Sequence, residues 1–241
     1  MRSLIILMSG LAAAACNMAD ARSGDVAQAS GEGSQRTYQV GDFDGLALGG
    51  QHKVNVQLGP AISVRAEGDA DELDRLEIRN DNGRLHIGQK DRNWSIGSRP
   101  ALNIFVTVPA LKKASIGGSG SMEIDKVQGE SFEAGIGGSG SINVGALAVR
   151  NASFDIGGSG SLRASGTAET AKIRIAGSGD ANLAAIEAKT ADISIAGSGE
   201  ARLRATETAK VSIAGSGNVT IDGPAKCTLK KAGSGRLNCG S

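Results

Sequence analysis

Few residues in this chain of 241 have side chains suited to catalysis. The two histidines, His52 and His86, lie in strand-like segments that are far apart in the sequence. Neither stands in a recognisable arrangement of nucleophile, general base and orienting group. Both are interpreted as ordinary surface or edge histidines, and the sequence predicts no catalytic residue and no enzyme activity.

Two glycine-rich patterns resemble ligand motifs. Residues 135–140 read Gly-Ile-Gly-Gly-Ser-Gly and so satisfy G-x-G-x-x-G, but the strand–helix–strand unit that dinucleotide binding requires does not surround them. A calcium-binding β-roll needs aspartates after its glycines. Only Asp180 and Glu200 follow the glycines with a carboxylate, which is too few for a calcium cage. The sequence therefore predicts no cofactor and no metal.

The N-terminus has the pattern of an export signal. A single positive charge precedes an apolar run from Leu4 to Ala15, which is too short to span a bilayer comfortably. Two cleavage sites compete. Cleavage before Cys16 would leave a lipidated N-terminus, as in a bacterial lipoprotein, whereas Ala19-Asp20-Ala21 fits ordinary signal peptidase. In both cases residues 1–21 are predicted as a signal segment, and the protein is expected in the periplasm, on the outer membrane through a lipid anchor, or at the cell surface.

The two remaining cysteines, Cys227 and Cys239, lie close to each other near the end of the sequence. Disulfides persist in the oxidising space outside the cytosol. We predict a disulfide that closes the last coil, with two reduced cysteines as the alternative.

The element that must position any site is a repeat of the tripeptide Gly-Ser-Gly. A period of about 20 residues, as found here, is typical of a solenoid, in which each repeat forms one coil stacked on the last. The last two repeats are slightly shorter, so the connections between coils are expected to shorten toward the C-terminus while the tripeptide is kept. The seven central serines are Ser119, Ser139, Ser159, Ser178, Ser198, Ser216 and Ser234.

The residues around each tripeptide predict strands. In the first repeat Ile116 is followed six residues later by Met122 and eight residues later by Ile124, and apolar residues recur at these offsets in nearly every repeat. Even offsets place residues on one face of a strand, so stacked coils would form continuous apolar columns inside. The glycines suit a repeated corner because they tolerate positive φ and close backbone approach. We expect the serines to form a hydrogen-bonded ladder from coil to coil.

The sequence before the repeats is divided into two parts. Residues 22–36 are rich in Ser, Gly, Gln and Ala without an apolar period, and are predicted as a flexible linker. Residues 37–113 are predicted as a strand-rich part of the same domain. It includes one helical turn within residues 69–76 and a hairpin of residues 76–78 with 85–87 around Asn82-Gly83. Residues 114–241 are predicted as the solenoid repeats.

Charge and composition exclude one class of partner. There are 26 basic and 25 acidic residues in scattered positions, and aromatic residues are 2% of the chain. Nucleic-acid binding normally needs a basic patch, and single-strand binding also needs stacking aromatics. We therefore expect no nucleic-acid partner.

Several segments together resemble a known family. They are Phe43-Asp44-Gly45-Leu46, Val54-Asn55-Val56 followed by Gly59, residues 81–87, Val106-Thr107-Val108-Pro109-Ala110-Leu111 and the Gly-Ser-Gly series. In this order they resemble bacterial envelope proteins of the auto-transporter adhesin, head GIN domain family, over about residues 38–237. The resemblance implies an all-β, right-handed parallel β-helix-like fold and export, often as a lipoprotein. It brings no catalytic residues, and only its name suggests adhesion. The seven tripeptides themselves predict about seven coils of 18–20 residues.

Three functions are compatible with these patterns. The first is a non-catalytic envelope protein that presents a rigid solenoid for adhesion or assembly, with a cell-surface glycan or an envelope protein as partner. The second is a polysaccharide-active or polysaccharide-binding β-helix protein. The third is a scaffold that self-associates into a homo-oligomer through exposed strands at the solenoid ends. Contact with a membrane is expected only through the lipid anchor.

Overall fold

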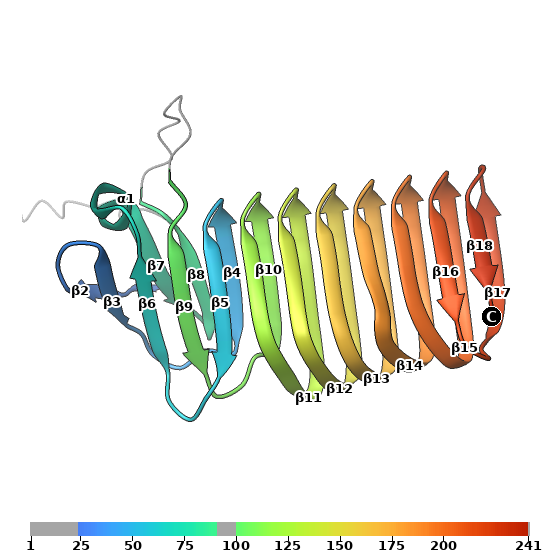
Figure 1. The fold of residues 1–241 in the computed structure, drawn as a ribbon, viewed down its shortest axis with the longest axis horizontal. Coiled ribbons are helices and arrows are strands. Elements are labelled where there is room, and N and C mark those ends of the chain that lie inside the picture. Colours follow the sequence, from blue (N-terminus) through green and yellow to red (C-terminus); the bar gives the residue numbers. More distant parts are fainter. Residues whose placement is uncertain (1–23, 91–99, 241) are drawn as a thin grey trace, which may run out of the picture.

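The computed structural model describes residues 24–90 and 100–240. Within these residues the protein is an all-β solenoid of about six turns, with strands stacked in parallel along one long axis (Figure 1). The predicted fold class is confirmed. Five long strands form its regular middle: β11 (Ser121–Gly138), β12 (Ser141–Gly158), β13 (Ser161–Gly177), β14 (Asp180–Gly197) and β15 (Glu200–Gly215).

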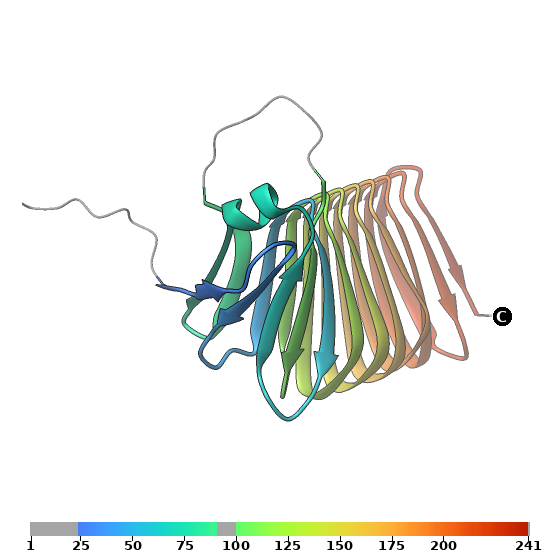
Figure 2. The ribbon, with the colours of Figure 1, turned by 60° about the vertical axis from the view of Figure 1, so that its left-hand side comes forward.

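Each of these long strands is one coil, bent so that its two halves face each other across the core (Figure 2). The Gly-Ser-Gly corner lies at one edge of the solenoid and the bend in the strand at the other. In β11 the first half buries Met122 and Ile124, and the return half buries Phe132 and Ile136. Every coil repeats this alternation in parallel register, so the core consists of columns with one residue from each coil. The offsets of six and eight residues predicted these columns correctly.

The two glycines of each corner are required by close backbone approach. Gly138 has φ 131°, and a Cβ there would lie 2.6 Å from the carbonyl oxygen of Gly118 in the preceding coil. Gly140 has an ordinary φ, but its Cβ would lie 2.7 Å from the Gly120 oxygen and 2.8 Å from Cγ2 of Ile116. Any side chain at either position would push the coils apart. The corner glycines are therefore determined by packing.

The corner serines do not form the hydrogen-bonded ladder that the sequence predicted. All seven are exposed, and a typical backbone contact is the Ser139 N–H donating to the Gly118 oxygen at 3.0 Å. Their hydroxyl groups form no hydrogen bond with another residue in the described ranges, so the predicted serine ladder is wrong. The side chains project away from the corner into solvent, where a hydroxyl has no need of a protein partner.

The solenoid begins earlier in the sequence than predicted. Strands β4 (Gly45–Gly50) and β5 (Lys53–Leu58) form a coil that pairs in parallel with β10 (Lys113–Gly118) and with the first half of β11. Beyond it lies another coil, made of β8 (Arg84–Gln89) and β9 (Asn103–Val108), which pairs in parallel with β4 and β5. The order of coils in space thus differs from their order in the chain, and the predicted boundary at residue 114 falls inside the stack.

The N-terminal end of the stack is covered by antiparallel strands. On one side β6 (Ser63–Glu67) pairs with β9, followed by β3 (Gln35–Gln39) and β2 (Gln28–Ser30). On the other side β7 (Leu76–Asp81) pairs with β8, and β1 (Asp25–Val26) pairs with β7. The predicted hairpin of β7 with β8 is confirmed, with Asn82 and Gly83 at positive φ in its turn.

The helical turn before this hairpin is also confirmed. Helix α1 (Ala70–Arg75) lies beside the covered end, and the Asp69 carboxylate caps it by accepting from the backbone N–H groups of Asp71 and Glu72. The linker prediction for residues 22–36 is wrong over residues 24–36, because β1, β2 and the start of β3 lie there. Of β1, β2 and β3, only Tyr38 has a buried side chain, so no apolar period was visible. Pairing with β6 and β7 makes these residues strands.

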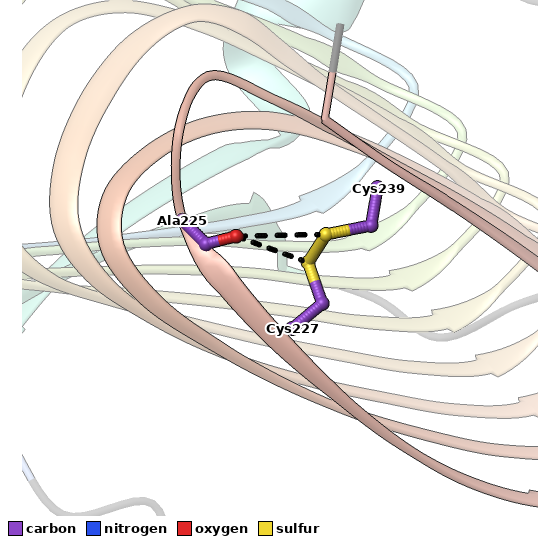
Figure 3. Close-up of a disulfide and its surroundings, with 3 residues drawn as sticks. All are labelled: Ala225, Cys227 and Cys239. Carbon is purple, nitrogen blue, oxygen red and sulfur yellow. Dashed lines mark hydrogen bonds between the residues drawn. A yellow bond between two sulfur atoms is a disulfide. The ribbon is translucent and has the colours of Figure 1, made fainter.

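The last coil consists of β16 (Asn218–Asp222), β17 (Lys226–Ala232) and β18 (Arg236–Cys239). The structure joins Cys227 and Cys239 as a disulfide between β17 and β18, with Cα atoms 6.4 Å apart (Figure 3). Both sulfur atoms lie 3.7–3.9 Å from the carbonyl oxygen of Ala225. Because a disulfide carries no S–H group, these are packing contacts. In the register of the stack, Cys227 pairs with the buried Ala209 of β15, and Cys239 pairs with the buried Ile221 of β16.

Candidate binding face

The outer side of the first half of each coil carries two adjacent columns of polar residues. They alternate with buried residues such as Met122 and Ile124, which is why they point outward. All their members are exposed or half-buried. We call these two columns the polar face; they consist of Ser121, Ser141, Ser161, Asp180, Glu200, Asn218 and Arg236, and of Glu123, Asn143, Arg163, Asn182, Arg202, Thr220 and Asn238.

The charged groups in the middle of the polar face are unpaired. Arg163, Asp180, Glu200 and Arg202 lie on three successive coils, β13 to β15, but form no ion pair or side-chain hydrogen bond with a residue inside the described ranges. Between β11 and β12, in contrast, the Asn143 amide donates to the Glu123 carboxylate at 2.7 Å. The middle of the face therefore has hydrogen-bonding capacity that the protein itself does not use.

The return halves and the bends have a different charge pattern. There, five pairs of oppositely charged side chains on successive coils form ion pairs: Lys113–Glu133 at 3.4 Å, Arg150–Glu130 at 3.5 Å, Arg174–Asp155 at 3.1 Å, Lys189–Glu169 at 3.7 Å and Arg204–Glu187 at 3.1 Å. Such exposed pairs contribute only about 0–1 kcal/mol each to stability. Their relevance here is that they occupy charges that would otherwise be available to a ligand. One column of the return halves, Lys172, Asp192 and Lys210, forms no ion pair within the described residues.

Two shallow hollows lie side by side on the polar face and share Asn182. The first, of about 300 Å³, contains the Arg163 side chain with the amides of Asn143 and Asn182 and the hydroxyl of Ser165. Its remaining lining is small and mostly apolar: Val144, Gly145, Ala164, Ala184 and Ala185. Arg163 is the only charged residue that lines it, so this hollow favours an anionic group.

The second hollow, of about 250 Å³, has a different charge. Asp180 and Glu200 line it from successive coils, together with Arg202. Asn182, Asn218 and Thr220 add amide and hydroxyl groups. Carboxylates only accept hydrogen bonds when ionised, whereas the guanidinium only donates. With two carboxylates and one guanidinium, this hollow suits a neutral group with several hydroxyls.

A larger hollow of about 460 Å³ lies over the bends, between Arg150 and Lys189. The charges in its walls are already paired, Arg150 with Glu130 and Lys189 with Glu169. Because its charged groups are satisfied within the protein, we take the polar face as the candidate site.

Residues 42–225 match the family described as "Putative auto-transporter adhesin, head GIN domain". The chain belongs to this family. Solved structures with a similar fold include a putative adhesin from Bacteroides fragilis (TM-score 0.80, 20% identity, 85% of this chain and 95% of that chain) and one from Parabacteroides merdae (TM-score 0.67, 19% identity, 86% and 95%). Another, from Parabacteroides distasonis, is described as a putative lipid binding protein (TM-score 0.69, 25% identity, 85% and 95%). No protein with a curated description matches the chain.

The structure of this head GIN protein keeps its two histidines in unrelated settings. His52 is buried, its Nδ1 accepts from the Leu102 N–H at 3.2 Å, and burial lowers its pKa below the usual value. His86 is exposed on β8, and partial burial together with the Arg84 guanidinium lowers its pKa as well. Neither lines a hollow of the polar face.

The part of the chain that the structure describes contains no candidate metal site and no candidate membrane-spanning helix. No group of three or more His, Cys, Asp or Glu side chains is arranged to hold a metal ion there. No helix among those residues has the length and apolar character to cross a bilayer. Cys16, the candidate for lipidation, lies outside the described residues, and its modification stays a prediction.

Of the column from Ser121 to Arg236, sequence reasoning had singled out only Asp180 and Glu200, as too few carboxylates for a calcium site. It did not combine this column with the adjacent one, in which Arg163 and Arg202 alternate with Asn143 and Asn182, because a shared face depends on register. A usable signal was present: the residue just before the buried residue at the eight-residue offset is polar in every repeat, and Asn or Arg recurs there.

Proposed function

We propose that this protein is a non-catalytic, exported envelope protein that acts in adhesion by holding a repetitive surface ligand along its polar face. The family supports a role like that of adhesins. The observation that carries the proposal is the set of unpaired guanidinium, carboxylate and amide groups on successive coils. Strands set these groups at intervals of about 4.8 Å along the axis, so a ligand that repeats along its length can contact several coils at once.

Rigidity of the scaffold favours this function. Most of the polar face lies on strands β11 to β15, each of which pairs with a neighbour on both sides. Its side chains therefore need little ordering of the backbone on binding, which lowers the entropic cost of association. Many weak contacts on one rigid face can add to a firm attachment when the ligand is itself repetitive.

A pair of matched variants tests the role of the face. The face variant combines Arg163→Ala, Asn182→Ala and Arg202→Ala. The control variant combines Lys172→Ala, Asp192→Ala and Lys210→Ala, which lie in one outward column of the return halves. Beads coated with each protein are incubated with bacterial cells, purified peptidoglycan and a glycan array. We expect at least tenfold weaker attachment for the face variant and unchanged attachment for the control, with equal thermal stability.

Failure of the unmodified protein to attach to any of these surfaces would refute adhesion. Equal loss in both variants would place binding elsewhere than on the polar face. Export is tested separately by fractionating cells that produce the full chain and by mass measurement of its N-terminus. A lipid on Cys16 would support anchoring, an N-terminus at Arg22 would support a released protein, and a cytosolic full-length chain would refute export.

A further inference from the structure

The two hollows of the polar face differ in charge, and this difference restricts the ligand. The hollow around Arg163 contains one cation and no carboxylate, while the adjacent hollow contains the carboxylates of Asp180 and Glu200 beside Arg202. Building on the adhesive function proposed above, we infer that the polar face binds an acidic polysaccharide in which a carboxylate-bearing sugar alternates with a neutral one.

Arg163 is placed to hold the anionic sugar. Its guanidinium has five N–H donors and no partner among the described residues, and the flanking amides of Asn143 and Asn182 add donors and acceptors. Arginine binds carboxylates with two parallel hydrogen bonds, which adds geometric selectivity. The nearest acidic member of its column, Glu123, is two coils away and is held by the Asn143 amide. The first hollow is therefore selective for a negative group.

The second hollow is suited to a neutral sugar. A carboxylate-bearing sugar there would face both Asp180 and Glu200, and like charges in contact are repelled. The hydroxyl groups of a neutral sugar, in contrast, can donate to these carboxylates and accept from Arg202 and Asn218. Arg163 lies on β13, and the carboxylates of Asp180 and Glu200 lie one and two coils away on β14 and β15, or about 5–10 Å along the axis. Consecutive sugars of one chain fit this separation.

Other polymers fit less well. A polypeptide strand cannot add to this face, because the backbone N–H and C=O groups of β13, β14 and β15 already serve the ladders to the coils on either side. Nucleic acid carries a phosphate at every nucleotide and would meet Asp180 and Glu200. Within β11 to β15 the two polar columns hold no aromatic ring for base or sugar stacking, so recognition depends on hydrogen bonds and charge.

Three polymers test the inference on the full chain. Hyaluronan oligosaccharides alternate a uronate with a neutral N-acetylated sugar, polygalacturonate has a carboxylate on every sugar, and dextran has none. Binding is measured by surface plasmon resonance at low and at high salt. We expect hyaluronan to bind at least tenfold more tightly than either of the others, and to weaken as salt rises.

Substitutions then separate the two hollows. Arg163→Gln should weaken hyaluronan binding at least tenfold, and the matched control Lys172→Gln, on the return half of the same coil, should not change it. Asp180→Asn with Glu200→Gln should raise the affinity for polygalacturonate, because the repulsion is removed.

Equal binding of hyaluronan and dextran, or no effect of Arg163→Gln, would overturn the inference. So would attachment of the protein to cells that none of the three polymers inhibits, although the proposed adhesive function would then stand. Absence of attachment to any cell or glycan would refute the proposed function itself.

Discussion

The Gly-Ser-Gly corner and the opposite bend close the same coils, but the corner has a fixed length and register whereas the bend does not. At the corner the register is continuous: Gly118, Gly138, Gly158 and Gly177 pair in sequence from coil to coil. At the bend the register shifts, as between Leu183 of β14 and the residues after it. The differences in repeat length are therefore absorbed at the bend, in agreement with the expectation that the connections shorten while the tripeptide is kept.

This comparison shows where variation, and with it specificity, can arise. The corner cannot change length, because each of its glycines lies against the backbone of the preceding coil. The bend can gain or lose a residue, and the first hollow of the polar face is lined by residues from it, Gly145, Ser165, Ala184 and Ala185. The corner provides the stacking, and the irregular bend shapes the surface beside Arg163.

Single-residue deletions are expected to give the largest difference in stability between the corner and the bend. Deleting Ser178 removes the tip of a corner and breaks the register of the glycines on both sides, which should cost more than about 4 kcal/mol. Deleting Ala184 shortens the bend of β14 to the length found in β13 and should cost about 1 kcal/mol. Urea unfolding followed by circular dichroism measures both. Equal destabilisation would show that the bend is as constrained as the corner.

Adding a methyl group at a corner glycine tests the close backbone contact with a smaller change than a deletion. Gly158 has φ 124°, and a Cβ would lie 2.5 Å from the Gly138 carbonyl oxygen. We expect Gly158→Ala to lower the free energy of unfolding by about 3 kcal/mol. The adjacent Ser159 is exposed, so Ser159→Ala should change it by less than about 0.5 kcal/mol. A cost of Ser159→Ala comparable with that of Gly158→Ala would mean that the serine also has a packing role.

The disulfide tests how the last coil is closed. Cys227→Ser with Cys239→Ser should lower the free energy of unfolding by about 2–3 kcal/mol, because the two cysteines close only a short loop. The loss should concentrate in faster amide exchange of β17 and β18, while β11 to β13 stay protected. Thiol titration of the native protein gives the control: two free thiols would contradict the disulfide.

A smaller effect on stability is expected from pH, through His52 at one unusual corner. In the coil of β4 and β5, His52 stands where the Gly-Ser-Gly coils have the second glycine, and its Nδ1 accepts from the Leu102 N–H. Burial lowers the pKa of His52 below 6.5, although the Glu72 carboxylate opposes this shift. The unfolded chain therefore binds the proton more readily. The contribution of neutral His52 to stability, complete above the unfolded pKa, is lost as the pH falls through its folded pKa.

Urea unfolding from neutral to mildly acidic pH measures this dependence. His52→Gln should reduce the loss of stability on acidification, and His86→Gln provides the comparison, since the pKa of His86 is also lowered but its side chain is exposed. An unchanged pH profile in His52→Gln would show that other groups cause the loss.

Part of the stack could have been found earlier in the sequence. Leu48, Val54 and Val56 have the same offsets of six and eight residues as the apolar columns of the repeats, and Gly49-Gly50 precedes His52 where the other coils have their corner. The replacement of Gly-Ser-Gly by Gly-Gln-His concealed this coil. Its corner accepts the imidazole because the next coil, of β8 and β9, offers the Leu102 N–H there.

The sequence alone determined the core and the corners of this protein. Apolar residues at even offsets must share one face of a strand, and glycines at a fixed period allow coils to approach closely, so both features are local and repeat with the sequence. Only the tertiary structure decided that β8 and β9 lie outside β4 and β5, that residues 24–36 contribute edge strands, and that Arg163, Asp180 and Glu200 share a face without pairing. These features depend on which strands pair and in which register, and that choice is made by contacts between residues far apart in the chain.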